Sequence, residues 1–158
     1  ECIACGERIV DYDRIENYVF DLAEKYGVTV MQIGYDRYNA ISSAQKWENG
    51  RPGGDGKEAC PGIETVEVRQ HSDTLHAPTK LFCELVESGR LAYEESRLFE
   101  VNVENARCTY DTNMNRYINK KRSNGKVDCV MAVVDALYLL QQNELLDADG
   151  GGFVCQVG

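Results

Sequence analysis

Residues 28–34 read Val-Thr-Val-Met-Gln-Ile-Gly and are apolar or β-branched at nearly every position. Such a run is typical of a β-strand that is covered on both faces. The segment before it, from Asp11 to Tyr26, has the spacing of an amphipathic helix, with Asp11 as its N-cap and Gly27 as its C-cap. A buried strand that follows a helix predicts an α/β layer.

The composition is that of one ordinary globular domain. The chain has 158 residues, of which 43% are hydrophobic and 27% charged, so we expect a single domain over residues 1–158 with a flexible tail at 143–158. No window reaches the roughly 18 uninterrupted apolar residues of a membrane span. The net charge of -9 argues against strong nonspecific attraction to phosphate backbones, although clustered carboxylates that hold divalent metal ions would also make a chain acidic.

The ends and the cysteines give two further expectations. The chain opens at Glu1 without a Met or a signal peptide, so we expect a fragment of a longer protein. Seven Cys is an odd number, which favours a reducing cytoplasm over a disulfide framework. Cys2 and Cys5 supply half of a tetrahedral zinc site, so a small zinc-binding interaction domain is a weaker alternative to small apolar residues in an edge strand.

The rest of the chain alternates helices, strands and turns. Periodicity, Gly and Pro predict a helix at Asn39–Trp47, a long loop at Glu48–Gly62, a strand at Glu64–Gln70, helices at Pro78–Ser88 and Leu98–Glu104, hairpin strands at Ala106–Tyr110 and Arg116–Lys121 around the turn Asp111–Asn115, and an apolar helix at Val127–Gln142.

Several motifs fail on inspection. The Gly53–Glu58 segment imitates a phosphate loop, but Glu58 stands where the magnesium-binding hydroxyl belongs. The turn at Asp111 imitates the start of a calcium loop, but Arg122 occupies the twelfth position, which must supply a carboxylate. His71 and His76 do not share a helical face, and we interpret them as residues of a loop and of a helix start rather than as catalytic groups.

Two aspartates occupy positions suited to chemistry. Asp36 directly follows the predicted strand 28–34, and open α/β sheets hold ligands at the carboxyl ends of their strands, although Asp36 could equally cap the next helix. Asp128 stands in the first turn of the last helix, where the helix dipole alone would favour an acid. Together the two carboxylates could converge on a hard cation.

Four segments, in this order, carry a resemblance to a known family. They are Ile33-Gly-Tyr-Asp-Arg-Tyr-Asn-Ala40, Val68-Arg-Gln70, Ala77-Pro-Thr-Lys80 with the helix that ends before Glu87-Ser-Gly-Arg-Leu91, and Lys126-Val-Asp-Cys-Val-Met-Ala132. From about Arg8 to Leu140 the chain resembles the C-terminal nuclease domain of tailed-phage terminase large subunits.

The resemblance implies an RNase H-like domain, with a mixed β-sheet flanked by helices, that cuts concatemeric double-stranded phage DNA during packaging. It implies that Asp36 and Asp128 are catalytic ligands of two Mg²⁺ or Mn²⁺ ions, and we expect Lys120, Lys121 and Arg122 to contact the DNA backbone or simply to be solvated. The implied partners are phage DNA, the portal protein and the small terminase subunit. The implied location is the cytoplasm of a bacterial host that carries the phage or prophage.

The chain also departs from the family. The family's first catalytic aspartate lies on an opening strand before the region that aligns with Glu1–Arg8, and no Asp here occupies that place, so we expect an N-terminally incomplete domain with weak or absent cleavage. Residues 1–158 do not include the family's upstream ATPase motor with its phosphate loop, so we expect this chain by itself neither to hydrolyse ATP nor to translocate DNA. The alternative from another class is a non-catalytic packaging or prophage-remnant module with the same fold, which metal binding would distinguish.

Overall fold

The computed structural model describes residues 10–54 and 56–143 of the 158. These residues fall into two compact units: the first lies within Glu1–Ile33 and Tyr38–Thr65, the second within Gly34–Arg37 and Val66–Gly158. The predicted tail and the Cys2/Cys5 pair lie outside the described residues. No helix of the described part is both long and apolar enough to cross a membrane.

In the first unit, α1 (Tyr12–Tyr26) confirms the predicted helix and both of its caps. The Asp11 carboxylate accepts a hydrogen bond from Arg14 N at 3.1 Å, as an N-cap does. Gly27 closes the helix with a φ of 65°, a left-handed conformation that glycine adopts without steric cost. The local chemistry of the sequence therefore fixes both ends of α1.

The helix α2 (Arg37–Asn49) packs against α1 through a buried polar cluster around Glu16. The Glu16 carboxylate accepts hydrogen bonds from Ser43 Oγ and from Lys46 Nζ, both at 2.7 Å. Trp47, which is 8% exposed, donates its indole N–H to the backbone oxygen of Glu16 at 3.4 Å. A buried carboxylate with this many donors is compensated for its lost hydration.

The predicted loop after α2 folds back on itself and is anchored by Arg51. Isolated antiparallel bridges pair Arg51 with Cys60 and Gly54 with Lys57. The Arg51 guanidinium donates to Asp21 Oδ1 on α1 at 2.6 Å and holds the pKa of that carboxyl below its usual value. The predicted loop at Glu48–Gly62 is confirmed from Gly50 onward, since Glu48 and Asn49 belong to α2.

The strands β1 (Gln32–Tyr35) and β2 (Glu64–Glu67) form a two-stranded sheet. Gln32 Nε2 donates to Glu64 Oε2 at 2.8 Å, and Val68 N donates to Tyr35 O at 2.9 Å. Later residues of β1 therefore contact later residues of β2 and its continuation, as in a parallel pair. The predicted strand at 28–34 is wrong in its bounds and its burial: Met31 is 74% exposed, and β1 itself is only half-buried. The predicted strand Glu64–Gln70 ends early, at Glu67.

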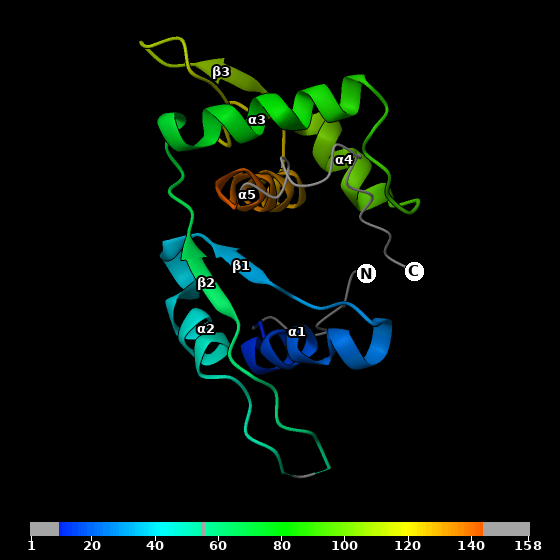
Figure 1. Cartoon of the computed structure of the whole chain (residues 1–158). Helices are drawn as coiled ribbons and strands as arrows, with labels where there is room; N and C mark the ends of the chain where they lie inside the picture. The colour runs from blue at the N-terminus through cyan, green and yellow to red at the C-terminus, as the bar shows by residue number, and fades with distance from the viewer. Residues whose placement is uncertain (1–9, 55, 144–158) are drawn as a thin grey trace. The chain divides into compact units, whose positions relative to one another are not determined.

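The second unit is built around α3 (Ser72–Glu87) and α5 (Asp128–Gln142), and Figure 1 shows α3 crossing α5, which is seen nearly end-on. The helix α3 begins six residues before the predicted start at Pro78. A proline inside a helix removes one backbone hydrogen bond. Pro78 is fully buried, and Leu75 and Phe82 on the same helix are buried as well, so packing in the core offsets that loss. His71 is the N-cap residue and His76 lies within the helix.

The core of this unit is apolar and is centred on α5. Its buried members are Val68, Leu75, Phe82, Ile118, Val127, Val130, Met131, Val134, Leu137 and Leu139. The short helix α4 (Arg97–Asn105) confirms the one predicted near Leu98–Glu104 and packs on α5. The apolar helix predicted at Val127–Gln142 is likewise confirmed, one residue shorter at its start.

The strands β3 (Cys108–Tyr110) and β4 (Arg116–Ile118) form the predicted antiparallel hairpin. Its turn is organised by Asp111, whose carboxylate accepts hydrogen bonds from Ser72 Oγ and from the backbone N–H groups of Asn113 and Asn115. These donors lower the pKa of Asp111 to about 2. The carboxylate that imitates a calcium ligand is thus a structural acceptor in a turn.

Candidate active site

The candidate site lies within the second unit, where the segment after β1 faces α5. Asp36 is the single residue between the end of β1 at Tyr35 and the start of α2 at Arg37, and its side chain is exposed. The sequence predicted this strand-end position, and the structure bears it out. What Asp36 faces is decided by the packing of β1 on α5.

Gly34 is the point where β1 meets α5. A Cβ added at Gly34 would lie 3.2 Å from Val68 Cγ2 and 3.3 Å from Leu139 Cδ1. Glycine therefore lets the strand approach Val68, which continues β2, and the helix at the same time. The three residues Gly34, Val68 and Leu139 define a packed layer.

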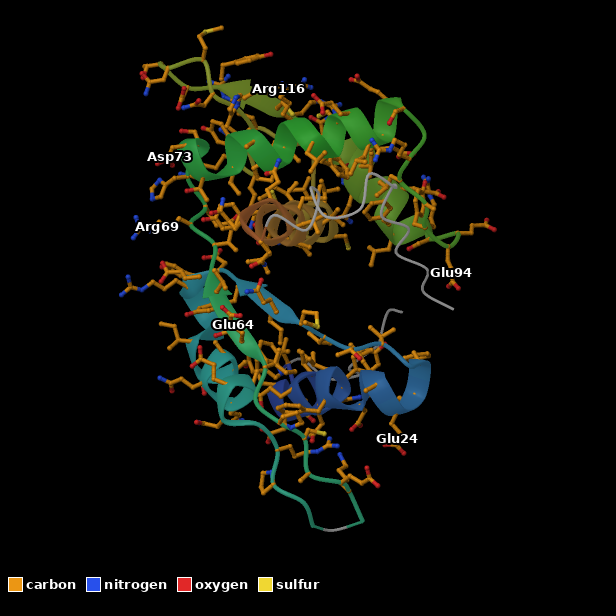
Figure 2. All side chains as sticks on the ribbon, viewed as in Figure 1. Glu24, Glu64, Arg69, Asp73, Glu94 and Arg116 are labelled. Atoms are coloured by element: carbon orange, nitrogen blue, oxygen red, sulfur yellow. The ribbon has the colours of Figure 1, made fainter. Side chains whose placement is uncertain are left out.

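The next layer along these three segments is polar. Two residues beyond Gly34 lies Asp36, two beyond Val68 lies Gln70, and four before Leu139 lies Asp135. Side chains two apart share a face of an extended strand, and side chains four apart share a face of a helix. Arg69, between Val68 and Gln70, projects outward instead (Figure 2). The geometry thus directs Asp36, Gln70 and Asp135 to the same place.

Direct contacts join two of these three residues. Gln70 Nε2 donates to both carboxylate oxygens of Asp135, at 3.0 Å and 3.3 Å, and also lies 3.3 Å from the backbone oxygen of Val68. The other amide atom, Gln70 Oε1, is buried and has no hydrogen-bond partner among the residues that the structure describes. The Gln70 amide therefore fixes the Asp135 carboxylate and leaves one buried oxygen available as an acceptor or ligand.

Burial raises the pKa of Asp135, and the nearby negative charge of Asp36 raises it further, whereas the Gln70 hydrogen bond and the positive charge of Lys120 oppose the shift. Desolvation is the largest of these effects. The carboxylate that the structure brings near Asp36 is thus that of Asp135.

Asp128 occupies the first residue of α5 and is exposed. The start of the helix is held by Asn102 on α4, whose side chain is 3% exposed and whose Oδ1 accepts a hydrogen bond from Cys129 N at 3.1 Å. Asn105 supports the preceding residues, because its Nδ2 donates to Lys126 O at 3.3 Å. The prediction that Asp128 lies at the start of a helix is confirmed, and the hydrogen bond to Asn102 shows that α4 positions this start.

Lys120, Lys121 and Arg122 are exposed in the turn that follows β4. Asn119 organises this turn, because its Oδ1 accepts hydrogen bonds from the backbone N–H groups of Lys121 and Arg122, at 3.0 Å and 3.3 Å. Of the three cations, Lys120 lies near enough to Asp135 for its charge to act on that carboxylate. The turn therefore presents positive charge beside the acidic layer.

The donor atoms of the site suit a hard divalent cation. The carboxylates of Asp36 and Asp135 and the unpartnered Gln70 Oε1 are all oxygen ligands, the kind that Mg²⁺, Mn²⁺ and Ca²⁺ prefer. No group of three or more His, Cys, Asp or Glu side chains that could hold a metal ion occurs within residues 10–54 and 56–143. Within the described residues, the amide oxygen of Gln70 is the oxygen that could complete a set of three ligands with the two carboxylates.

A known family accounts for most of the chain. The family model described as "Terminase large subunit, endonuclease domain" matches residues 6–144, which is most of the chain. The chain belongs to this family. No curated protein matches it.

A solved terminase structure has a fold similar to that of this chain. The chain is similar to the crystal structure of the HK97 bacteriophage large terminase, with a TM-score of 0.66 and 16% sequence identity over 82% of this chain. It spans only 25% of that terminase chain. The likeness confirms the predicted RNase H-like α/β fold.

The contact between Gln70 and Asp135 was not predicted from the sequence. Asp135 was visible as one of two acids in the most apolar stretch of the chain, and acids are almost never fully buried unless they are paired. Its spacing of seven residues from Asp128 also puts both on one helical face. These two signals together would have marked Asp135 as a site residue.

Proposed function

We propose that this terminase domain is a divalent-metal-dependent endonuclease that cuts concatemeric double-stranded DNA during phage packaging. The observation that carries the proposal is the position of Asp36, an exposed carboxylate at the end of β1 whose charge acts on the Asp135 carboxylate of α5. An acidic pair of this kind, in a chain whose family is described as an endonuclease domain, suits metal-assisted hydrolysis.

Asp36 and Asp128 are the proposed metal-holding catalytic residues. When bound, two Mg²⁺ or Mn²⁺ ions would supply an activated water and would stabilise the leaving 3′ oxygen in an in-line attack on the phosphodiester. Two residues of the chain would hold and orient the ions: Asp36 at the end of β1, and Asp128 at a helix start that is fixed by Asn102. Lys120, Lys121 and Arg122 would bind the DNA phosphates beside the acidic residues.

The proposed setting follows the family as well. The substrate is phage DNA, and the partners are the portal protein and the small terminase subunit, in the cytoplasm of an infected or lysogenic bacterium. Because the chain spans a quarter of the HK97 terminase chain, the motor activity of a whole terminase is not part of this proposal.

A nicking assay tests the nuclease. We expect the chain to convert supercoiled plasmid slowly to nicked and linear forms in Mn²⁺, and EDTA to abolish this conversion. Asp36→Asn and Asp128→Asn should each reduce the rate at least about 100-fold, since each removes a charged ligand of the metal centre.

The matched control is Glu84→Gln, an exposed acid on α3 whose ion pair with Lys80 is 3.7 Å long, which should leave the rate unchanged. Cleavage that survives both aspartate substitutions would rule out the assigned centre. A folded chain that binds no metal would instead favour the non-catalytic packaging module.

A further inference from the structure

We propose that Asp135, held in place by Gln70, is an additional metal-binding carboxylate and acts together with Asp36. The inference rests on the proposed nuclease function and extends it to one residue of α5 and one residue of the segment after β2. It assigns Asp135 as a ligand and Gln70 Oε1 as a neutral oxygen ligand or a water acceptor.

The first support is the register between the three segments. Gly34, Val68 and Leu139 are in close contact, which fixes the register, and the hydrogen bonds from Gln70 to Asp135 show that the turn of α5 before Leu139 lies beside the residues that follow Gly34 and Val68. The residues concerned are Asp36, Gln70 and Asp135. The contact of Gln70 with both Asp135 oxygens confirms the register on one side, and the effect of the Asp36 charge on Asp135 agrees with it on the other.

The second support is that a purely structural role explains this arrangement poorly. Asp135 lies on α5 next to Val134 and near Leu137, which are both buried, so an ionised carboxylate at this position loses hydration. Within the described residues Lys120 acts on Asp135 through its charge but forms no salt bridge with it, the side chain that hydrogen-bonds Asp135 is the neutral amide of Gln70, and the nearby Asp36 is another anion. Two acids held near each other are stabilised when a cation binds between them.

The third support is the unpartnered Gln70 Oε1. The amide is oriented by its Nε2 bonds to Asp135 and to Val68 O, so its oxygen cannot turn away without breaking them. A buried acceptor without a donor is energetically unfavourable, because it has lost its hydrogen bonds to water. A bound cation or its water shell would satisfy this oxygen together with the two carboxylates.

The spacing along α5 gives Asp135 a role distinct from that of Asp128. Seven helical residues rise about 10.5 Å, so the two acids lie on one face but nearly two turns apart. Two metal ions of a nuclease centre lie only about 3.5–4 Å apart. The register therefore places Asp135 as the α5 carboxylate beside Asp36, whereas Asp128 lies nearly two turns away on the same face of the helix.

Electron paramagnetic resonance of Mn²⁺ tests the inference without requiring cleavage. Free Mn²⁺ is titrated against the chain and against Asp36→Asn, Asp128→Asn, Asp135→Asn and the control Glu84→Gln. We expect a saturable site in the unsubstituted chain, weakened at least about tenfold by Asp36→Asn and by Asp135→Asn and unchanged by Glu84→Gln. Asn at position 135 keeps an oxygen acceptor for Gln70 Nε2, so circular dichroism should show a native fold.

Gln70→Met tests the positioning role of the amide. Met has a similar length but neither donates to Asp135 nor offers an amide oxygen, and loss of an orienting partner typically costs 10–100-fold in metal affinity. The Mn²⁺ affinity of Gln70→Met remains a test of the inference if Asp135→Asn does not fold.

The outcomes separate the two claims. If Asp36→Asn and Asp128→Asn weaken Mn²⁺ binding while Asp135→Asn and Gln70→Met do not, the role of Asp135 is overturned and the nuclease proposal stands. If Asp36→Asn and Asp135→Asn weaken binding and Asp128→Asn does not, Asp135 is supported and Asp128 loses its assignment. A chain without any saturable Mn²⁺ site contradicts both claims.

Discussion

At the residue scale, Asp135 is unusual because its surroundings disfavour the charge that the proposed chemistry requires. Burial and Asp36 raise its pKa, and only Gln70 and Lys120 act in the other direction. Asp111 has the opposite environment, since four hydrogen bonds from Ser72, Asn113 and Asn115 lower its pKa to about 2. Residues retained against stability in this way are expected at functional sites.

We predict that Asp135→Asn stabilises the metal-free chain at pH 7. Because the folded-state pKa of Asp135 lies above its ordinary value of 3.8, the native state holds a proton that the unfolded chain releases, and stability falls as the pH rises through this interval. The substitution removes that loss. Thermal unfolding followed by circular dichroism between pH 4 and pH 8 should therefore show a gain in Tm at pH 7 that shrinks toward pH 4.

Glu84→Gln on exposed α3 should show no comparable gain, which makes it the reference for a general effect of lowering the negative charge. A lower Tm for Asp135→Asn than for the unsubstituted chain at pH 7 would mean that the ionised carboxylate is structural.

At the element scale, the start of α5 depends on a neighbouring helix. Val127, its N-cap residue, makes no side-chain cap bond, and Asn102 of α4 accepts from Cys129 N in its place. The same Asn102 donates through Nδ2 to Leu98 O at 2.9 Å. Capping from outside the helix ties the position of Asp128 to the packing of α4 on α5.

Asn102→Ala should destabilise the chain by about 1–3 kcal/mol, because it removes a buried cap and leaves its partners without a hydrogen bond. Urea unfolding measures this change. Glu104→Ala on the same helix is the control: its ion pair with Arg97 is exposed and is worth at most about 1 kcal/mol. An equal and small effect of both substitutions would show that α5 starts without help from α4.

At the scale of the whole molecule, the chain carries a net charge of -9 but needs a local positive surface if it is to hold DNA. The turn at Lys120–Arg122 supplies such a surface, and Asn119 orders its backbone. Binding through a few cations on an acidic protein should be weak and sensitive to salt.

Lys121→Ala combined with Arg122→Ala should weaken DNA binding about equally for all sequences and flatten its salt dependence. Each lost phosphate contact reduces the slope of log K against log salt by about 0.9, so the pair should reduce it by nearly 2. Fluorescence anisotropy in Ca²⁺ measures both quantities without cleavage. Lys80→Ala combined with Arg97→Ala, exposed cations of α3 and α4, is the matched control, and an unchanged slope in the Lys121 and Arg122 variant would remove this turn from the DNA interface.

The sequence by itself determined what local chemistry controls. The caps Asp11 and Gly27 fixed α1, the Asp111 turn fixed the hairpin, the apolar period fixed α5, and the strand-end and helix-start positions of Asp36 and Asp128 followed from these elements. The family motifs, spread in order along the chain, gave the fold class correctly.

Only the tertiary structure decided what no short window of sequence contains. The strand predicted at 28–34 is Gln32–Tyr35 in the structure, because pairing with β2 outweighs local propensity. The helix α3 begins before Pro78, because burial in the core likewise outweighs local propensity. The meeting of Asp36, Gln70 and Asp135 depends on the contact of Gly34 with Val68 and Leu139, residues that are 34 or more positions apart in the chain. Side-chain periodicity gives the face on which a residue lies, whereas packing between distant segments decides which faces meet.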